Sequence, residues 1–133
     1  MMCIGGQLLP IHLALSSQWK VHYFSSDMAG NAAYRAEEAA FLDDPAGFLG
    51  AAAMATLTAV GEAIDLDYFG MDCCLTADGN ILLFEANATM VLQPPANDAL
   101  WDYRRAATER ALQAIRRLFI ERSGCGRAAS EMV

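Results

Sequence analysis

The sequence predicts an α+β fold, with a mainly antiparallel sheet of two hairpins covered by about three helices. Three observations lead to this prediction. Two apolar runs flank an Asp-Gly pair near the middle of the chain, two shorter alternating runs lie near its start, and three segments of helical composition lie between and after them. The hairpins supply at least four strands, and the helices supply the apolar faces that cover them.

The central hairpin is the element that the sequence defines best. Apolar runs at residues 68–76 and 80–87 flank Asp78 and Gly79. This residue pair is strongly preferred in the type I′ turns that join strands through two-residue loops. We therefore predict a tight antiparallel hairpin whose first cross-strand pair is Ala77 with Asn80.

The register of this hairpin gathers polar side chains on one face. Counting outwards from the predicted turn places Asp72 directly opposite Glu85 and Gly70 opposite Asn87. Because side chains alternate along a strand, Asp72, Glu85 and Asn87 then share a face.

Two carboxylates opposite each other on a ladder repel unless something compensates their charge. A divalent cation is one form of compensation, and the oxygen ligands of Asp72, Glu85 and Asn87 suit a hard ion such as Mg²⁺ or Mn²⁺. The alternative is that these acids simply face water. That alternative does not account for Asn87 on the same face, with Gly70 opposite leaving room, so we favour the metal site.

The pattern G-M-D, apolar strand, D-G turn and L-L-F-E-A-N resembles the metal-binding hairpin in the C-terminal lobe of the ATP-grasp superfamily. That superfamily includes D-alanine–D-alanine ligase, glutathione synthetase and glutamate-adding peptide ligases. The resemblance implies that Asp72, Glu85 and Asn87 hold Mg²⁺ against the phosphates of ATP. It also implies that Phe84, next to Glu85, helps to form the floor of the adenine site.

The resemblance covers residues 7–95 and therefore only the C-terminal lobe. The lobe that supplies lysines and a covering loop to the ATP phosphates is missing from this sequence, and Gly70 stands where many ligases carry an arginine. The first strand pair, the R-A-E-E-A-A-F-L helix and L-D-Y-F-G-M-D together look most like the ATP-grasp-like segments attached to helical-repeat proteins.

A second hairpin is predicted nearer the start, with strands at residues 8–15 and 19–25. Its second strand carries Lys20 and His22 on one face, and His12 pairs with Val21 or with His22, depending on the loop length. In ATP-grasp ligases, cationic side chains from nearby strands stabilise the acyl phosphate. Lys20, His22 and His12 are therefore candidate catalytic residues, with ordinary structural roles as the alternative.

Three helices are predicted from composition and end signals. The first covers residues 27–42, and the second, residues 45–63, opens with Asp44 as N-cap and Pro45 at its first position. The third covers residues 99–122 and ends near a glycine, with an apolar stripe on one side. The arginines of this last helix are expected on a solvated face or a surface for an acidic partner.

Composition limits the possible classes of protein. The 133 residues allow one domain, which we place at residues 1–126 with a loose tail at 127–133. The net charge of −7 argues against a nucleic-acid-binding protein, and no apolar run is long enough to span a membrane. The four cysteines lack metal-ligand spacing, so we expect reduced thiols and a cytoplasmic protein.

We therefore expect the C-terminal lobe of an ATP-grasp carboxylate–amine or carboxylate–thiol ligase, with Mg²⁺ and ATP as cofactors and a small carboxylate as substrate. Such a lobe is expected to be inactive alone. The second hypothesis is a non-catalytic, ATP-grasp-derived module that acts in oligomerisation or partner binding, because the surface left by the missing lobe calls for a partner. A metal-dependent hydrolase is a third hypothesis, for which the sequence offers no base–water pair.

Overall fold

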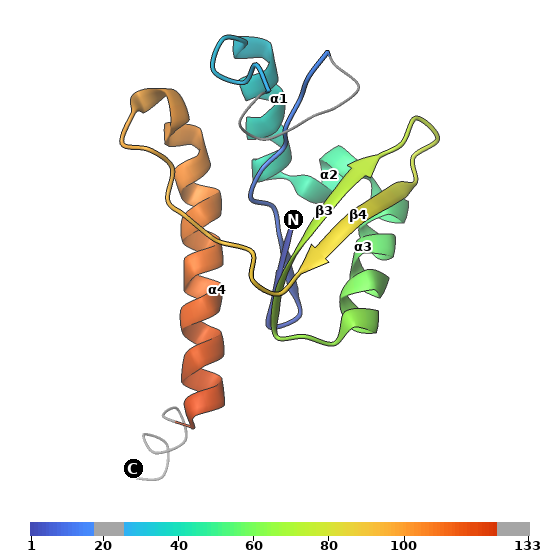
Figure 1. The fold of residues 1–133 in the computed structure, drawn as a ribbon, viewed down its shortest axis with the longest axis vertical. Coiled ribbons are helices and arrows are strands. Elements are labelled where there is room, and N and C mark those ends of the chain that lie inside the picture. Colours follow the sequence, from blue (N-terminus) through green and yellow to red (C-terminus); the bar gives the residue numbers. More distant parts are fainter. Residues whose placement is uncertain (18–25, 125–133) are drawn as a thin grey trace.

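The computed structural model describes residues 1–17 and 26–124 of the chain. Figure 1 shows a small sheet with helices on both of its sides. The elements in chain order are β1 (Met2–Ile4), β2 (Gln7–Leu9), α1 (Ala32–Asp43), α2 (Pro45–Leu49), α3 (Ala51–Ile64), β3 (Tyr68–Leu75), β4 (Ile81–Asn87), the 3₁₀ helix η1 (Ala99–Arg104) and α4 (Arg105–Ser123).

The predicted α+β class and the two antiparallel hairpins are confirmed. The four strands form one sheet in the order β2-β1-β3-β4, and each neighbouring pair is antiparallel. The sheet joins two hairpins, β1–β2 and β3–β4, through the pairing of β1 with β3. The outer edge of β4 pairs with no described strand.

The strand predicted at residues 8–15 is wrong beyond Leu9, and the first hairpin of the described chain lies nearer the start. The hairpin is β1–β2, joined at Gly5 and Gly6, whose φ angles are +56° and +75°. Two consecutive left-handed residues are what a type I′ turn requires, and glycine adopts them without a steric cost. β2 ends at Leu9 because Pro10 has no N–H to donate to a ladder. The predicted second strand, residues 19–25, lies entirely outside the described residues.

The first two predicted helices are shorter and more divided than expected. α1 begins after Asn31, whose side chain accepts hydrogen bonds from two backbone N–H groups, so the turn before it is not helical. Asp44 caps α2 by accepting from Gly47 N, as its position before Pro45 predicted. The helix then stops at Gly50, whose φ of +82° and ψ of +161° are not helical, and α3 starts anew.

The last predicted helix begins as 3₁₀ structure. Asp98 caps η1 by accepting from Leu100 N, and η1 continues into α4 at Arg105. α4 ends at Gly124, which has a φ of +71°, the left-handed C-terminal geometry that glycine favours. Among the described residues, no helix has the length and the apolar character that a membrane span needs.

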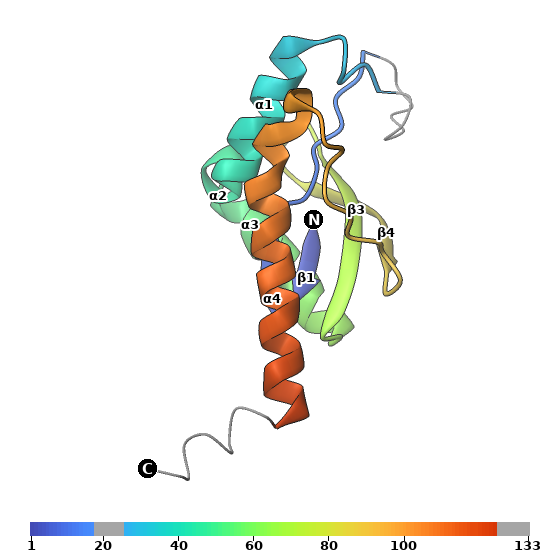
Figure 2. The same ribbon diagram turned by 90° about the vertical axis from the view of Figure 1, so that its left-hand side faces the viewer.

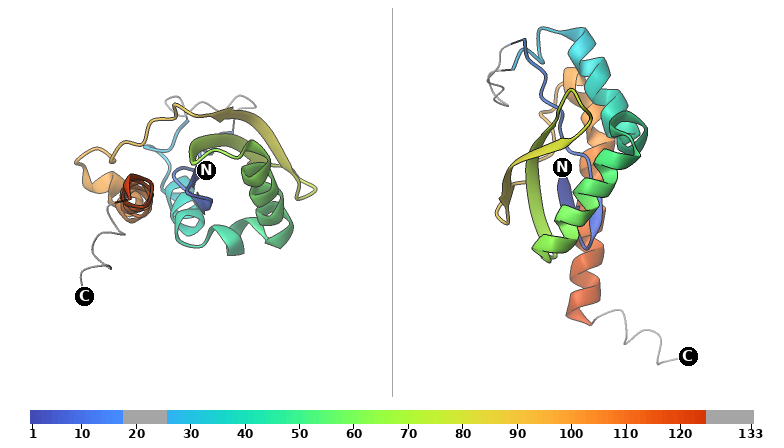
Figure 3. Two further views of the ribbon diagram at one scale, coloured as in Figure 1. Left: turned by 90° about the horizontal axis from the view of Figure 1, so that it is seen from below. Right: turned by 90° about the vertical axis from the view of Figure 1, so that its right-hand side faces the viewer.

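The two faces of β1 bury different helices. Met2 and Ile4 pack against Ala111 and Ala114 of α4, whereas Cys3, between them, packs against Leu57 of α3. Figures 2 and 3 show the result, with α4 on one side of β1 and α3 on the other. Phe41 and Leu42 of α1 pack against Ala107 near the start of α4. The small side chains of α4 let this helix approach β1 closely.

On β3, the same alternation leaves part of one face uncovered. Phe69 and Met71 are fully buried in the cluster beneath α3. Gly70 and Asp72 belong to the opposite face, which we call the outer face, and Asp72 is exposed. The outer face of the β3–β4 hairpin is therefore where the predicted site lies.

Candidate functional site

The turn of the β3–β4 hairpin has three residues where two were predicted. Thr76 N donates to Asn80 O at 2.8 Å, so Thr76 and Asn80 face each other. Ala77 therefore belongs to the loop, and Gly79 takes the left-handed conformation, with a φ of +81°. This is the arrangement typical of three-residue hairpin loops.

A bulge in β4 corrects the shift that this longer turn introduces. Cys73 pairs with Leu83, but the next residue of β3, Asp72, pairs with Glu85, so Phe84 is an extra residue in β4. Without the bulge, Asp72 would face Phe84, and Glu85 would face the buried Met71. The predicted pairs, Asp72 with Glu85 and Gly70 with Asn87, are confirmed because two irregularities offset each other.

The structure brings the three predicted ligands together on the outer face. Asp72 and Glu85 are cross-strand neighbours and both are exposed. Asn87 Nδ2 donates to Glu85 Oε1 at 3.0 Å, which holds the Glu85 carboxylate on this face. The hairpin thus presents two carboxylates and one amide side by side.

The charges of the two carboxylates are compensated only in part within the described chain, because the Met1 amino group interacts electrostatically with Asp72. Within the described residues, 1–17 and 26–124, no ion pair includes Asp72 or Glu85. Carboxylates directly opposite each other on a ladder destabilise it. The pair therefore has both the position and the unbalanced charge to attract a cation.

The donor set fits a divalent cation in part. Over the described residues, no group of three or more His, Cys, Asp or Glu side chains is placed to hold a metal ion, so Asp72 and Glu85 would be the only anionic ligands. Asn87 Oδ1 already accepts from Thr89 N at 2.8 Å and from Thr89 Oγ1 at 2.7 Å. An ion such as Mg²⁺ that keeps several waters needs only one or two carboxylates, which this pair supplies.

The space expected above Gly70 is filled by a side chain of the same chain. A Cβ built at Gly70 would lie 2.0 Å from Met90 Sδ. Met90 is held there because Tyr68 Oη donates to Met90 O at 2.6 Å. Gly70 therefore makes room for Met90. The predicted adenine contact, Phe84, is 65% exposed on β4.

The candidate catalytic residues are not on this face as far as they are described. Lys20 and His22 lie outside the described residues. His12 lies in the segment after β2, where its Nδ1 contacts Oε1 of Glu38 on α1. The histidine thus belongs to a second polar group, formed between α1 and η1.

This second group, which we call the Glu38 cluster, consists of Glu38, His12, Tyr103 and Arg104. Glu38 is fully buried. Its Oε1 accepts from His12 and from Leu13 N at 3.1 Å, and its Oε2 accepts from Tyr103 Oη at 2.5 Å and from Arg104 Nη2 at 2.6 Å. Glu38 therefore joins three segments that are far apart in the sequence.

The electrostatics of the Glu38 cluster balance within it. Burial raises the pKa of Glu38, but hydrogen bonds from His12, Tyr103 and Arg104 and the His12 charge outweigh burial and hold this pKa below its usual value. Burial and the hydrogen bond to Glu38 raise the pKa of Tyr103 to about 12. The Arg104 guanidinium also lies 4.3 Å from the centroid of the Trp101 ring. Each charge is compensated, which is typical of a structural ion pair.

Sequence reasoning gave no site role to Glu38 or Tyr103, and its expectation of a solvated face or an acidic-partner surface for the arginines of the last helix is wrong for Arg104. Arg104 is buried, because it faces Glu38 across the contact between η1 and α1. One signal could have found the acid. Glu38, Phe41 and Leu42 follow the i, i+3, i+4 spacing of a buried helix face, which places a carboxylate in the core.

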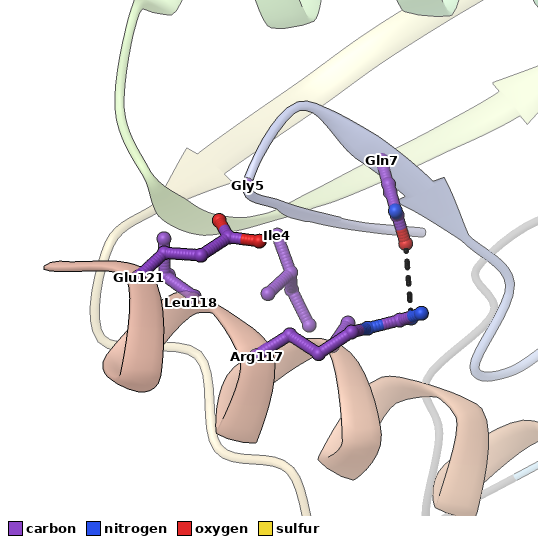
Figure 4. A pocket seen from close by; sticks show the side chains of 7 residues that line it. Ile4, Gly5, Gln7, Arg117, Leu118 and Glu121 are labelled. Atoms are coloured by element: carbon purple, nitrogen blue, oxygen red, sulfur yellow. Dashed lines mark hydrogen bonds between the residues drawn. The ribbon is translucent and has the colours of Figure 1, made fainter. Parts of the chain in front are cut away.

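Two hollows lie away from the hairpin carboxylates. One is a crevice between α4 and the β1–β2 turn, where Arg117 and Glu121 flank Ile4 and Arg117 reaches Gln7 Oε1 at 3.5 Å (Figure 4). The other lies between Cys3 on β1 and the C-terminal end of α3. Neither of these two hollows includes Asp72 or Glu85, which are both exposed.

Comparison of the chain with protein-family models, with curated proteins and with solved structures found no match.

Proposed function

We propose that this chain is the C-terminal lobe of an ATP-grasp type ligase, a fragment or truncated form that binds Mg·ATP for carboxylate activation through an acyl phosphate. The observation that carries the proposal is the hairpin face on which Asp72 and Glu85 oppose each other, in no ion pair of the described residues, beside Asn87. The resemblance of G-M-D and L-L-F-E-A-N to the superfamily hairpin gives this face its proposed ligand.

Each of these hairpin residues has a proposed role in binding Mg·ATP. Asp72 and Glu85 would hold Mg²⁺, or Mn²⁺ in its place, which when bound neutralises phosphate charge. Asn87 orients Glu85 through its Nδ2 and would be a third ligand if its oxygen gave up one bond to Thr89. Phe84, exposed next to Glu85, offers an aromatic surface for the adenine ring.

The proposed reaction also needs groups that the described chain does not bring to the hairpin. Acyl phosphate formation requires fixed positive charges around the transferred phosphate. Lys20, His22 and His12 are the proposed source in this chain, although His12 contacts Glu38, and a second lobe would supply the remainder. We therefore propose that the chain alone is inactive and binds Mg·ATP weakly, in a cytoplasmic setting that keeps its thiols reduced.

A second candidate is a non-catalytic module of the same origin that acts in oligomerisation or partner binding. The exposure of three consecutive apolar side chains on an edge strand, Leu82, Leu83 and Phe84, favours it. Sheet edges with exposed apolar side chains readily add another chain.

The proposal is tested by the effect of Mg²⁺ or Mn²⁺ on thermal stability. A ligand that binds only the folded state stabilises it, by about 1.4 kcal/mol at ten times its Kd. We expect the melting temperature of the wild type to rise with millimolar metal, and that of Asp72→Asn/Glu85→Gln to stay constant. Calorimetry with Mg·ATP then shows whether nucleotide adds to the effect.

The matched control is Glu37→Gln/Asp43→Asn, which removes the same charge from two exposed acids on α1. This variant should keep the full metal response. An equal response in Asp72→Asn/Glu85→Gln would place the ions elsewhere and overturn the proposed site.

A further inference from the structure

The molecule has a second exposed apolar surface, at the end of α4. Phe119 is 70% exposed and Ile120 is 53% exposed, although both follow directly on Leu118, which packs against the sheet. Arg116 lies three residues before Phe119 and four before Ile120, and Arg122 lies three residues after Phe119, so each arginine is next to an exposed apolar side chain on the helix. We call these four residues the α4 end.

The α4 end extends beyond the sheet. In Figures 1 and 2 the last turns of α4 continue past the β1–β2 hairpin. The buried residues of α4 lie between Ala107 and Ala114, in its first half. Phe119 and Ile120 lie beyond this buried part of α4, and both side chains are exposed.

The charges of this surface and of the hairpin are opposite in sign. We call Leu82 and Phe84, with the carboxylates of Asp72 and Glu85, the β4 surface. Residues 1–98 hold two basic and twelve acidic side chains, whereas residues 99–133 hold seven basic and four acidic ones. The Arg116 and Arg122 side chains are 68% and 69% exposed, so both surfaces combine exposed apolar groups with charged ones, carboxylates on the β4 surface and guanidinium groups on the α4 end.

From this complementarity we propose that copies of this chain associate head to tail, with the α4 end of one copy on the β4 surface of the next. Arg116 pairs with Glu109, and Arg122 pairs with Asp67. Both ion pairs are exposed and contribute little to stability, so the two arginines can pair with the carboxylates of a second copy instead. Phe119 and Ile120 would cover the apolar side chains of β4.

Charge also argues against the symmetric alternative. If two copies joined through their β4 surfaces, each would bring the carboxylates of Asp72 and Glu85 to the contact and no cation from that surface, and like charges at an interface repel. In the head-to-tail contact these carboxylates meet arginines. Such a heterologous contact uses two different surfaces of each copy, so it forms open chains or closed rings.

The test uses two variants that each remove one surface. Leu82→Ser/Phe84→Ser removes the apolar part of the β4 surface, and Phe119→Ser/Ile120→Ser removes that of the α4 end. All four side chains are more than half exposed, so the fold should be kept, which circular dichroism and urea unfolding check. The mass in solution is measured by sedimentation over a range of concentrations and ionic strengths.

We expect the wild type to grow beyond a dimer as its concentration rises, and to dissociate as ionic strength rises from about 0.05 to about 0.5 M. Each variant alone should be a monomer. An equimolar mixture of the two variants should give a dimer and nothing larger, because one intact surface of each kind remains.

Three results would overturn this proposal: a wild type that stays a monomer, association of Phe119→Ser/Ile120→Ser by itself, or a mixture that contains only monomers. The inference does not rest on the proposed function, because it is read from mass and not from a metal response. Association without a metal effect would support the head-to-tail contact and not the metal site. A metal effect without association would support the metal site and not the contact.

Discussion

Two groups of acidic side chains in this molecule differ in almost every respect. Glu38 is fully buried and accepts from His12, Leu13, Tyr103 and Arg104. The Asp72–Glu85 pair is exposed, and within the described residues only the Asn87 amide binds it. The first carboxylate is fully compensated by its own chain, so it has nothing left to offer a ligand. The second pair is exposed and takes part in no ion pair of the described residues.

The comparison teaches that the neighbours of an acid, more than its type, separate structural from functional roles. Removing a fully compensated carboxylate leaves its partners buried and unpaired, which is costly. Removing one of two repelling carboxylates relieves a strain. Mutations in the two groups should therefore have opposite effects on stability.

The largest effect is expected for Glu38→Ala. Arg104 would remain buried without its carboxylate, and losing one partner of a buried ion pair typically costs about 3–5 kcal/mol. Urea unfolding measures this loss, and Glu37→Ala, its exposed neighbour on α1, is the matched control. A loss as small as that of the control would mean that Glu38 is not the centre of a compensated cluster.

A smaller effect of the same origin is expected from pH. Hydrogen bonds and charge hold the pKa of folded Glu38 below the ordinary value of 4.5, so the unfolded chain binds its proton first as pH falls. The stability that Glu38 contributes is therefore present above about pH 4.5 and is lost below it.

The measurement is the difference in free energy of unfolding between the wild type and Glu38→Gln, followed from about pH 6 to about pH 3. We expect this difference to shrink as pH falls. A difference that stays constant over this range would show that the stability contributed by Glu38 does not depend on its ionisation.

The smallest effect, opposite in sign, is expected for Asp72→Asn. Replacing one of two opposed carboxylates should stabilise the metal-free protein by about 0.2–1 kcal/mol. Unfolding in the presence of a chelator measures this gain, which salt should reduce because both groups are exposed. If the variant is less stable than the wild type, the pair contributes to the fold and the contrast with Glu38 is lost.

Local patterns predicted the parts of this fold that depend on neighbouring residues. The Asp44-Pro45 cap, the α4 stripe with its final glycine and both strands of the central hairpin lie where sequence signals placed them. Gly5 and Gly6 carried an equally local signal for a hairpin turn, which the prediction did not use. The first strand pair was therefore predicted at residues 8–15 and 19–25, further along the chain than β1 and β2.

The Glu38 cluster could not be predicted from local patterns. Its contacts join residues 26 to 66 positions apart, and which arginine of α4 or η1 faces α1 depends on how the helices pack. The register of the metal face was predicted correctly, although the turn that led to it was not. The bulge at Phe84 has no signal in the sequence that would have revealed it in advance.

The bulge has a consequence for insertions and deletions in β4. In a regular ladder the partners of Cys73 and Asp72 would be consecutive residues of β4. Phe84 is the extra residue between these partners, and it is largely exposed. A chain from which Phe84 is deleted could join Leu83 directly to Glu85 and still set Asp72 opposite Glu85, along an unbroken ladder. A chain one residue longer at the same place would need a second irregularity to do so. This stretch of β4 therefore tolerates a change of length in one direction only.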